Sequence, residues 1–397
     1  MSETVLAPDT EAGIAGAVLA AATAGEPLAI EGNGTKRALL RPVQASCTLS
    51  LRNLSGITLY RPQELILAAW AGTPLPEVEA ALAERGQHLI AEPPDFSALF
   101  GSTLPATLGG VVAANLSGPR RIAWGAMRDH VMGIRAVNGA GEVFRSGGRV
   151  LKNVTGLDLC KLLTGAHGTL GVLTEITLKV LPAPQAVGTL AVPMADLAGG
   201  VRVLSAGLRS PFGVSGAALL PDGTAGLRGA ASGPVAILRI EEFPESVAYR
   251  CGRLRDELGG TILDDAASRA LWRSVRDAEP LGATPEDAIW RVSVQPSAGP
   301  AVAAAVQSAF AAKVLLDWGG GLVWIAGPAT HAAHDAVVVA ATAGRGGFTL
   351  FRAPAPLRAS VAVIPEEPPA LAAIGRRVKA VMDPKGVLNP GRMRAGV

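Results

Sequence analysis

The run Gly32-Asn33-Gly34-Thr35-Lys36 has residue types and spacing suited to holding an anion. Glycines allow successive backbone N–H groups to converge in a nest, which a pyrophosphate fits. Thr35 adds a hydroxyl donor and Lys36 a positive charge. The run lacks the Gly-Lys-Ser/Thr ending of a Walker A loop, and Arg37 stands where the dinucleotide fingerprint has its third glycine. Taken alone, it fits either an anion-binding loop or a tight surface turn.

Two further glycine-rich runs occupy residues 105–121 and 163–175. Gly109-Gly110 beside Thr107 would let a flat ligand approach the main chain closely, because glycine has no side chain in the way. In the later run, three glycines, Gly165, Gly168 and Gly171, lie just before a strand pattern, so backbone is expected to pack tightly there. Each run taken separately also fits a packing turn.

Arg120 and Arg121 are the weak candidates for a catalytic role. A guanidinium group can hold a small carboxylate through two parallel hydrogen bonds. Pairing with cofactor phosphates or with a partner subunit explains the same two residues equally well.

The sequence gives little support for a metal site or for a catalytic nucleophile. Cys47, Cys160 and Cys251 are far apart and form no Cys-x-x-Cys, so we expect no disulfide framework, zinc site or iron–sulfur cluster. His331 and His334 form a lone His-x-x-His, and we predict that both face solvent from a helix.

The elements that must position these runs can be read from capping and periodicity. We predict a helix over residues 10–24, with Asp9 and Thr10 as the N-cap types and Gly25 as its end, and a short strand over 28–30 that leads into the first glycine run. A second helix is predicted over 73–85, with Thr73 as its N-cap. Alternation around a glycine-rich turn predicts a hairpin over 134–144. The proline-rich break at 182–184 is the predicted domain boundary.

Composition excludes several classes of protein. With 49% hydrophobic and 17% charged residues among 397, the chain can bury a core and is not disordered. A net charge of +3 does not predict a nucleic-acid partner. We see no signal-type start and no apolar run of about 18–20 residues, so we expect a cytoplasmic protein without a membrane span, peripheral to the inner membrane through partners.

Irregularly interspersed strands and helices favour an α+β fold over a doubly wound sheet.

The glycine runs, taken together and in order, match a known family. Residues 32–182 and the tail 383–391 resemble the FAD-binding domain shared by vanillyl-alcohol oxidase, p-cresol methylhydroxylase (PCMH) and the D-2-hydroxy-acid dehydrogenases. Segments 92–94, 118–121, 152–154 and 350–353 resemble more closely the E subunits of bacterial glycolate oxidases. The resemblance implies a two-subdomain PCMH-type FAD-binding domain over 1–184, an α+β cap over 185–345, and a C-terminal segment, 346–397, that returns to the FAD domain.

The resemblance also implies a site. The first run would hold the FAD pyrophosphate, the second would lie along the isoalloxazine and ribityl chain, and the third would bond flavin and adenine edges through backbone. The implied cofactor-binding residues are Gly32, Asn33, Gly34, Thr35, Lys36, Thr107, Leu108, Gly109, Gly110, Asn115, Ser117, Gly118, Gly168, Leu170, Gly171, Val172 and Thr174. We expect Asp158 and Asn389 to be structural caps beside the site.

We expect the FAD to be non-covalent, because His130 is interpreted as a packed side chain and not as an attachment point. We expect no metal, since the His-rich cap motif of metal-dependent relatives is missing from the sequence.

The implied function is a FAD-binding subunit of a glycolate oxidase, which converts glycolate, a small 2-hydroxy acid, to glyoxylate. The implied partners are a larger FAD-containing hydroxy-acid dehydrogenase subunit and an iron–sulfur subunit. Two alternatives stay open: a self-sufficient FAD-dependent oxidase of another small 2-hydroxy acid or alcohol, and a non-catalytic electron-relay or structural subunit.

Overall fold

The computed structural model describes residues 4–148, 157–221 and 233–396. The chain divides into two compact units. The first comprises Met1–Ser117, Gly125–Ala183 and Glu366–Val397, and the second comprises Gly118–Trp124 and Pro184–Pro365. Both units mix helices with sheets, so the expected α+β class is confirmed. No helix among the described residues is long and apolar enough to cross a membrane.

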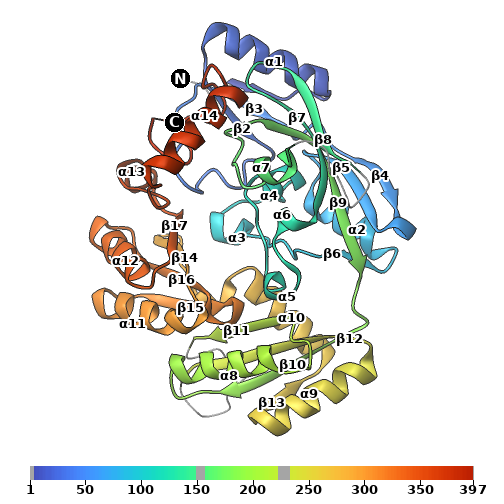
Figure 1. The fold of residues 1–397 in the computed structure, drawn as a ribbon, viewed down its shortest axis with the longest axis vertical. Helices are drawn as coiled ribbons and strands as arrows, with labels where there is room; N and C mark the ends of the chain where they lie inside the picture. The colour runs from blue at the N-terminus through green and yellow to red at the C-terminus, as the bar shows by residue number, and fades with distance from the viewer. Residues whose placement is uncertain (1–3, 149–156, 222–232, 397) are drawn as a thin grey trace. The chain divides into compact units, whose positions relative to one another are not determined.

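The first unit contains two sheets (Figure 1). Its strands are β1 (Thr4–Leu6), β2 (Leu28–Glu31), β3 (Cys47–Ser50), β4 (Ile57–Arg61), β5 (Ile66–Trp70), β6 (Gln87–Leu89), β7 (Val131–Val137), β8 (Val143–Gly147) and β9 (Val172–Pro182). Its helices are α1 (Glu11–Ala24), α2 (Leu75–Ala83), α3 (Ser97–Phe100), α4 (Leu108–Ala113), α6 (Met127–His130), α7 (Leu159–Leu163) and α14 (Pro369–Met382), with a 3₁₀ turn η1 (Pro62–Glu64).

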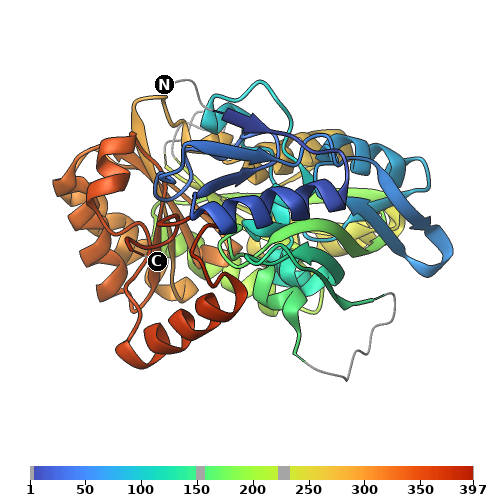
Figure 2. The ribbon, with the colours of Figure 1, turned by 90° about the horizontal axis from the view of Figure 1, so that it is seen from above.

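The small sheet is parallel, in the order β1-β3-β2, and the larger one is antiparallel, in the order β4-β5-β9-β7-β8 with β6 beside β9. Helix α1 runs beside the small sheet (Figure 2). Of the two expected N-cap types, Thr10 is the one used: its hydroxyl accepts from the Gly13 N–H, and the helix ends at left-handed Gly25, as predicted. Two buried apolar side chains one turn apart, Ile14 and Val18, bind it to the core.

One predicted cap is wrong. Helix α2 begins at Leu75 with Pro74 at the N-cap position, and the buried Thr73 hydroxyl bonds instead to the backbone of Gly56. This helix needs no capping side chain, because Pro76 has no N–H and the N–H groups of Leu75 and Glu77 donate to the carbonyls of Ala106 and Pro74. Thr73 is therefore used to join two loops.

The C-terminal tail adds to the edge of the small sheet. Leu388 forms a parallel bridge with Leu28, and the buried Asp383 carboxylate accepts the N–H groups of Val387 and Leu388. Lys379 in α14 pairs with Asp383 at 2.6 Å and also donates to the Thr169 carbonyl. These bonds hold residues some 350 positions after β2 directly against it.

The second unit is built on one eight-stranded antiparallel sheet in the order β13-β10-β12-β11-β15-β16-β14-β17. Its strands are β10 (Ala186–Pro193), β11 (Gly216–Leu220), β12 (Val235–Glu242), β13 (Thr261–Leu263), β14 (Asp287–Ser293), β15 (Lys313–Asp317), β16 (Leu322–Pro328) and β17 (Gly347–Arg352). Its helices are α5 (Arg121–Trp124), α8 (Leu197–Arg209), α9 (Pro244–Leu258), α10 (Asp265–Arg276), α11 (Gly299–Ala309), α12 (His331–Ala343) and α13 (Ala355–Ser360), with 3₁₀ turns η2 (Glu279–Leu281), η3 (Pro296–Ala298) and η4 (Trp318–Gly320).

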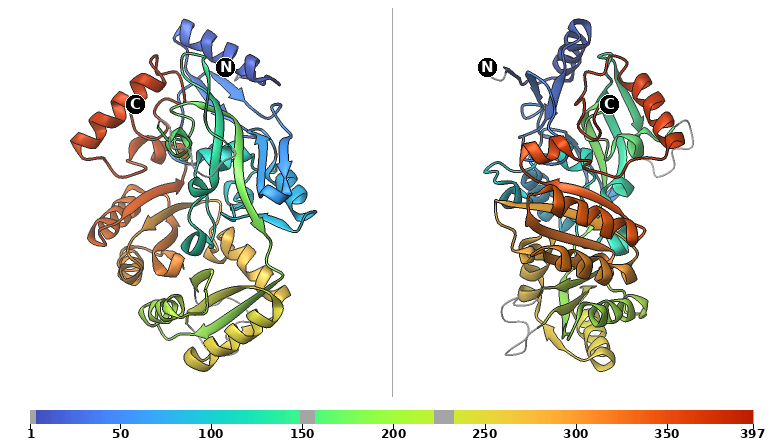
Figure 3. Two further views of the ribbon diagram at one scale, coloured as in Figure 1. Left: turned by 45° about the vertical axis from the view of Figure 1, so that its right-hand side comes forward. Right: turned by 90° about the vertical axis from the view of Figure 1, so that its left-hand side faces the viewer.

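Helices α11 and α12 lie across one face of this sheet (Figure 3). The buried Trp290 of β14 points to that face, because its indole N–H donates to His334 of α12 at 3.2 Å. His334 is therefore a buried core residue, and only His331 of the predicted solvent-facing pair is exposed. The alternation of a strand places the next residue, Arg291, on the opposite face.

The expected boundaries differ from the structure at two places. Residues 346–365 belong to the second unit, because β17 pairs along β14, so the segment that joins the first unit starts at Glu366 and not at 346. Residues 118–124 also belong to the second unit, although they were expected within the FAD domain.

Candidate functional site

The first glycine run forms the loop that follows β2 in the first unit. The Ser50 hydroxyl donates to the Gly32 carbonyl at 2.8 Å, and the Asn33 amide donates to the Pro105 carbonyl at 3.0 Å. Gly34 has φ +70°, a left-handed conformation in which a β-carbon is strained. These features fix the path of the loop.

The loop presents a row of unused donors. Within the described chain, no backbone or side-chain acceptor receives the N–H groups of Asn33, Gly34, Thr35 and Lys36. Buried or partly buried N–H groups are normally paired, and successive unpaired ones bind anions. The row therefore favours an anion site over a surface turn.

These donors line a cavity of about 310 Å³. The walls come from β2 and its loop, the start of α4, the segment 163–173 and the C-terminal tail. The lining residues are Ala29, Ile30, Glu31, Gly32, Asn33, Gly34, Thr35, Lys36, Arg37, Leu39, Pro42, Val43, Ala45, Thr48, Leu51, Ala71, Thr107, Gly109, Gly110, Ala113, Ala114, Leu163, His167, Gly168, Gly171, Val172, Leu173, Asn389 and Arg392.

Two glycines of the cavity wall are required by close packing. A β-carbon on Gly32 would lie 2.0 Å from the Thr107 hydroxyl, and one on Gly109 would lie 2.7 Å from the Ala71 β-carbon. Gly32 and Thr107 thus bring the β2 loop against α4, whose N-cap is Thr107 itself. Larger residues at either position would separate the two walls.

The charges in the cavity are mainly positive. Burial lowers the pKa of Lys36 to about 8, and Asp95 opposes that shift, while the Lys36 amine donates to the Thr35 hydroxyl at 3.1 Å. Burial and the nearby Arg392 lower the pKa of His167 to about 3, so its imidazole is neutral at pH 7. The Glu31 carboxylate pairs with Arg37 at 2.7 Å. A bound anion would meet a positive potential here.

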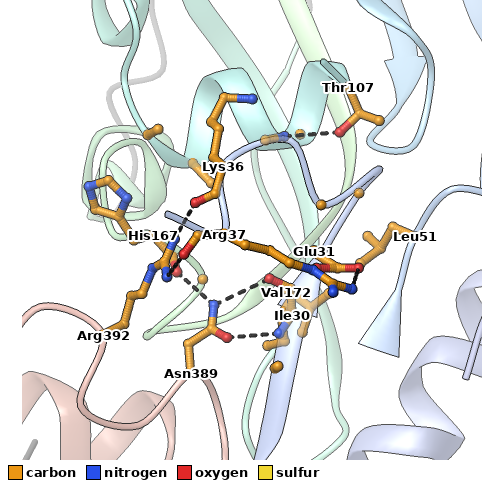
Figure 4. Close-up of a pocket in the computed structure, with 18 of the residues that line it drawn as sticks. Ile30, Glu31, Lys36, Arg37, Leu51, Thr107, His167, Val172, Asn389 and Arg392 are labelled. Atoms are coloured by element: carbon orange, nitrogen blue, oxygen red, sulfur yellow. Dashed lines mark hydrogen bonds and ion pairs between the residues drawn. The ribbon is translucent and has the colours of Figure 1, made fainter. Parts of the chain in front are cut away.

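The tail closes one side of the cavity (Figure 4). The Asn389 side chain accepts the Ile30 N–H at 2.7 Å and donates to the His167 carbonyl at 2.8 Å. Arg392 donates to the carbonyls of Lys36, Arg37 and Arg41 at 2.7, 3.2 and 3.1 Å. The tail therefore joins the anion loop to the third glycine run.

Comparison with known proteins identifies this arrangement. A family model described as an FAD binding domain matches residues 2–147. Glycolate oxidase subunit GlcE of Escherichia coli (strain K12) is 34% identical over 377 residues, which cover 93% of each chain.

The chain belongs to the GlcE family of FAD-binding oxidoreductases.

Other relatives of the GlcE family match shorter stretches. D-lactate dehydrogenase of Anaerostipes hadrus is 34% identical over 38% of this chain and 30% of its own length. Glycolate oxidase subunit GlcD of Bacillus subtilis (strain 168) is 31% identical over 38% of this chain and 30% of its own length. Among solved structures, an alkyldihydroxyacetonephosphate synthase has a TM-score of 0.72 at 17% identity and covers 97% of this chain and 76% of its own, a likeness of fold.

Most of the cofactor-binding residues predicted from the family line the cavity: Gly32, Asn33, Gly34, Thr35, Lys36, Thr107, Gly109, Gly110, Gly168, Gly171 and Val172. The others, Leu108, Asn115, Ser117, Gly118, Leu170 and Thr174, do not line it.

Packing accounts for these exceptions. Leu108 is fully buried in the core, and the buried Thr174 hydroxyl donates to Glu11 at 2.6 Å. The side chains of Asn115 and Ser117 accept backbone N–H groups of α6. Gly118 belongs to the second unit, where its carbonyl accepts from Trp318.

The two candidate arginines lie in the second unit and have different partners. Arg120 pairs with Glu241 at 2.6 Å, and the pKa of that carboxyl is held well below its usual range by Arg239 and Arg120 despite burial. The Arg120 guanidinium is thus committed to a protein carboxylate and is a poor candidate for substrate binding. Arg121 instead stacks over the Trp318 ring at 4.5 Å.

The remaining predictions have mixed outcomes. Asp158 is the N-cap of α7, as expected for a structural cap, and His130 is buried. The predicted segment 152–154 lies outside the described residues. No group of three or more His, Cys, Asp or Glu side chains able to hold a metal ion occurs within 4–148, 157–221 and 233–396.

Sequence reasoning missed several lining residues, of which His167 and Arg392 matter most. His167 stood inside the third glycine run, and its φ of +52° puts it in the conformation that glycine favours. Arg392 follows the Asn-Pro-Gly tail directly, so a basic residue beside that motif was the available signal.

Proposed function

We propose that the chain is the FAD-binding subunit of a glycolate oxidase complex that converts glycolate to glyoxylate. The full-length similarity to GlcE carries the proposal, since it covers both units of the chain. The cavity supports it, because unused N–H donors, a lysine and an arginine suit the pyrophosphate of a dinucleotide.

The residues of the first unit would hold FAD without a covalent bond. The N–H groups of residues 33–36 and the Lys36 amine would receive the pyrophosphate, and the glycines at 109, 110, 168 and 171 leave room for flat rings near backbone. Bound FAD supplies two-electron redox chemistry that amino-acid side chains do not supply. The chain itself positions the cofactor and provides the positive potential that offsets its charge.

Partners are part of the proposal. Oxidation of glycolate to glyoxylate releases two electrons and two protons, and the electrons need an acceptor beyond this chain. The chain has three cysteines, one fewer than a Cys₄ iron–sulfur cluster needs. A larger FAD-containing hydroxy-acid dehydrogenase subunit and an iron–sulfur subunit would complete the path, and they would bring the complex to the inner membrane as a peripheral assembly.

The test begins with the purified chain. Its visible spectrum should show flavin, and acid precipitation should release the colour into the supernatant, whereas colour kept in the pellet would contradict non-covalent binding. Co-expression of the three subunits should give glycolate-dependent dye reduction that falls at least 10-fold without this chain.

The outcomes separate the alternatives. Full dye reduction without this chain, together with no co-purification, would reject the complex. Turnover of another 2-hydroxy acid by the chain alone would identify a self-sufficient oxidase. A flavin-free chain that still supports the complex would identify a structural subunit.

A pH dependence of FAD binding follows from Lys36. The protonated amine attracts the pyrophosphate, and the pKa of Lys36 is about 8 in the FAD-free protein. FAD affinity should therefore be steady below about pH 7.5 and fall as the pH rises above 8, when the amine loses its charge. Lys36→Gln should weaken binding about 10-fold at pH 7, the loss of one charge-assisted hydrogen bond, and remove this dependence.

Fluorescence titration of FAD between pH 6 and 9.5 measures the effect. Lys161→Gln is the matched control, because that lysine is exposed in the same unit and its one ion pair with a described residue is with the exposed Asp158. A Lys36→Gln variant with the parent's affinity and pH profile would show that this amine does not meet FAD.

A further inference from the structure

A second arrangement of charge lies in the second unit, at Arg291 in β14. In the sheet register, Arg291 stands opposite Trp324 of β16 and Thr349 of β17. Its side chain is on the face opposite α12, because the neighbouring Trp290 bonds to His334 of that helix. Arg291 thus occupies the sheet face that α11 and α12 leave uncovered.

The Arg291 guanidinium is surrounded by aromatic rings. Its central carbon lies 4.8 Å from the Trp324 ring centroid, and 5.4 Å from those of Trp318 and Phe351. Trp324 and Phe351 themselves meet edge to face at 5.2 Å. Such rings stabilise a cation partly and fix the plane of its donor fork.

Arg291 makes no ion pair or hydrogen bond through its side chain with any residue that the structure describes. Its Nε atom is buried, while the side chain as a whole stays partly exposed. A desolvated charge without a hydrogen-bonding partner is energetically costly. A position of this kind is stabilised when an anion binds.

A second guanidinium lies beside it. Arg121 of α5 lies over the same Trp318 ring, 4.5 Å from its centroid. Burial and the charge of Arg121 lower the pKa of Arg291 to about 10, while Asp317 opposes the shift. The buried Asp317 carboxylate is engaged nearby, because it accepts the Trp318 N–H at 2.7 Å.

Trp318, whose ring both arginines contact, is held in a strained conformation. Its φ is +52°, in the left-handed region that disfavours large side chains, and Gly319 and Gly320 that follow also have positive φ. The indole N–H donates to the Gly118 carbonyl at 3.2 Å, which fixes the ring. The turn and this hydrogen bond together fix the position of the Trp318 ring.

Two other arginines of this unit have their charges neutralised by a carboxylate. Arg120 and Arg239 share the Glu241 carboxylate at 2.6 and 3.4 Å. Arg291, by contrast, makes no ion pair with any residue that the structure describes.

We propose that Arg291, with Arg121 over the same Trp318 ring, forms a binding site for the carboxylate of a small organic acid. Arg291 is the principal donor, and Arg121 adds positive charge beside it. That this acid is a 2-hydroxy acid such as glycolate rests on the proposed function, whereas the carboxylate site rests on the side chains alone.

The test is calorimetric titration of the full FAD-loaded chain with glycolate, and with the neutral analogue glycolamide. Glycolate should bind and glycolamide should not. Arg291→Gln and Arg121→Gln should each weaken glycolate binding about 10- to 100-fold, the loss of charge-assisted hydrogen bonds. Arg202→Gln, at an exposed arginine of α8 in the same unit, should bind glycolate as the parent does.

The other possible results also decide whether this carboxylate site exists. Unchanged affinity in the folded Arg291→Gln and Arg121→Gln variants, or no carboxylate binding at all, would overturn the site. Inorganic phosphate that binds tighter than glycolate and depends on Arg291 would overturn the carboxylate assignment. Binding of acetate or D-lactate, but not glycolate, with the same dependence on Arg291 would keep the site and reject glycolate as the substrate. Should Arg291→Gln fail to fold, Arg121→Gln on its short helix decides.

Discussion

Replacing Gly34 by aspartate is expected to weaken FAD binding about 10- to 100-fold. A β-carbon at this position would lie 3.0 Å from Arg37 Nε and 3.1 and 3.2 Å from the two Glu31 carboxylate oxygens. A second carboxylate there repels Glu31 and competes for Arg37, and it adds negative charge beside the N–H row that would receive a pyrophosphate. At about 4 Å, one such charge pair is worth about 1–4 kcal/mol. The positive φ of Gly34 adds backbone strain.

Gly34→Asn separates charge from shape, because asparagine has the size of aspartate and tolerates left-handed backbone. We expect its FAD affinity to stay within about 5-fold of the parent. Both variants are compared by FAD titration and by thermal melting of the FAD-free chain. Equal flavin occupancy in Gly34→Asp and the parent would contradict the role of this loop.

The local parts of the fold could be predicted because they depend on near neighbours. Thr10 and Gly25 delimit α1 by their own local chemistry, and the glycine run after β2 predicted a loop, which the structure shows lining a cavity. Thr73 shows the limit of the same reasoning: its type fits a helix N-cap, but a loop 17 residues away takes its hydroxyl. Which competing partner wins is decided by tertiary contacts.

The arginines show a second limit. The sequence drew attention to the pair Arg120 and Arg121, yet the two side chains diverge, one to Glu241 and the other to Trp318. Arg291, about 170 residues later, stood in an unremarkable strand. Only the register of β14 against β16 and the turn at Trp318 bring it to Arg121. When a cluster forms between strands of a sheet, its residues have no regular spacing in the sequence, so the sequence alone does not predict it.

Asn389→Ala is expected to lower the free energy of unfolding by about 2–4 kcal/mol and to impair FAD binding. The buried amide of Asn389 accepts the Ile30 N–H and donates to the His167 carbonyl, so alanine leaves two backbone groups without a partner. Its φ of +43° adds to the cost, since alanine tolerates this conformation less well than asparagine. Because Ile30 and His167 both line the cavity, their release should loosen two of its walls together.

Asn53→Ala is the matched control, because Asn53 is an exposed asparagine of the same unit that makes one side-chain bond, to the Ala7 carbonyl. Urea denaturation and FAD titration of the two variants distinguish a tail that organises the cavity from one that only covers it. An organising tail predicts that Asn389→Ala loses both stability and FAD affinity, while Asn53→Ala loses neither by more than about 1 kcal/mol. If Asn389→Ala lost stability but kept the parent's FAD affinity, the tail would support the fold without shaping the cofactor site, and the loop at residues 32–36 would be sufficient for FAD binding.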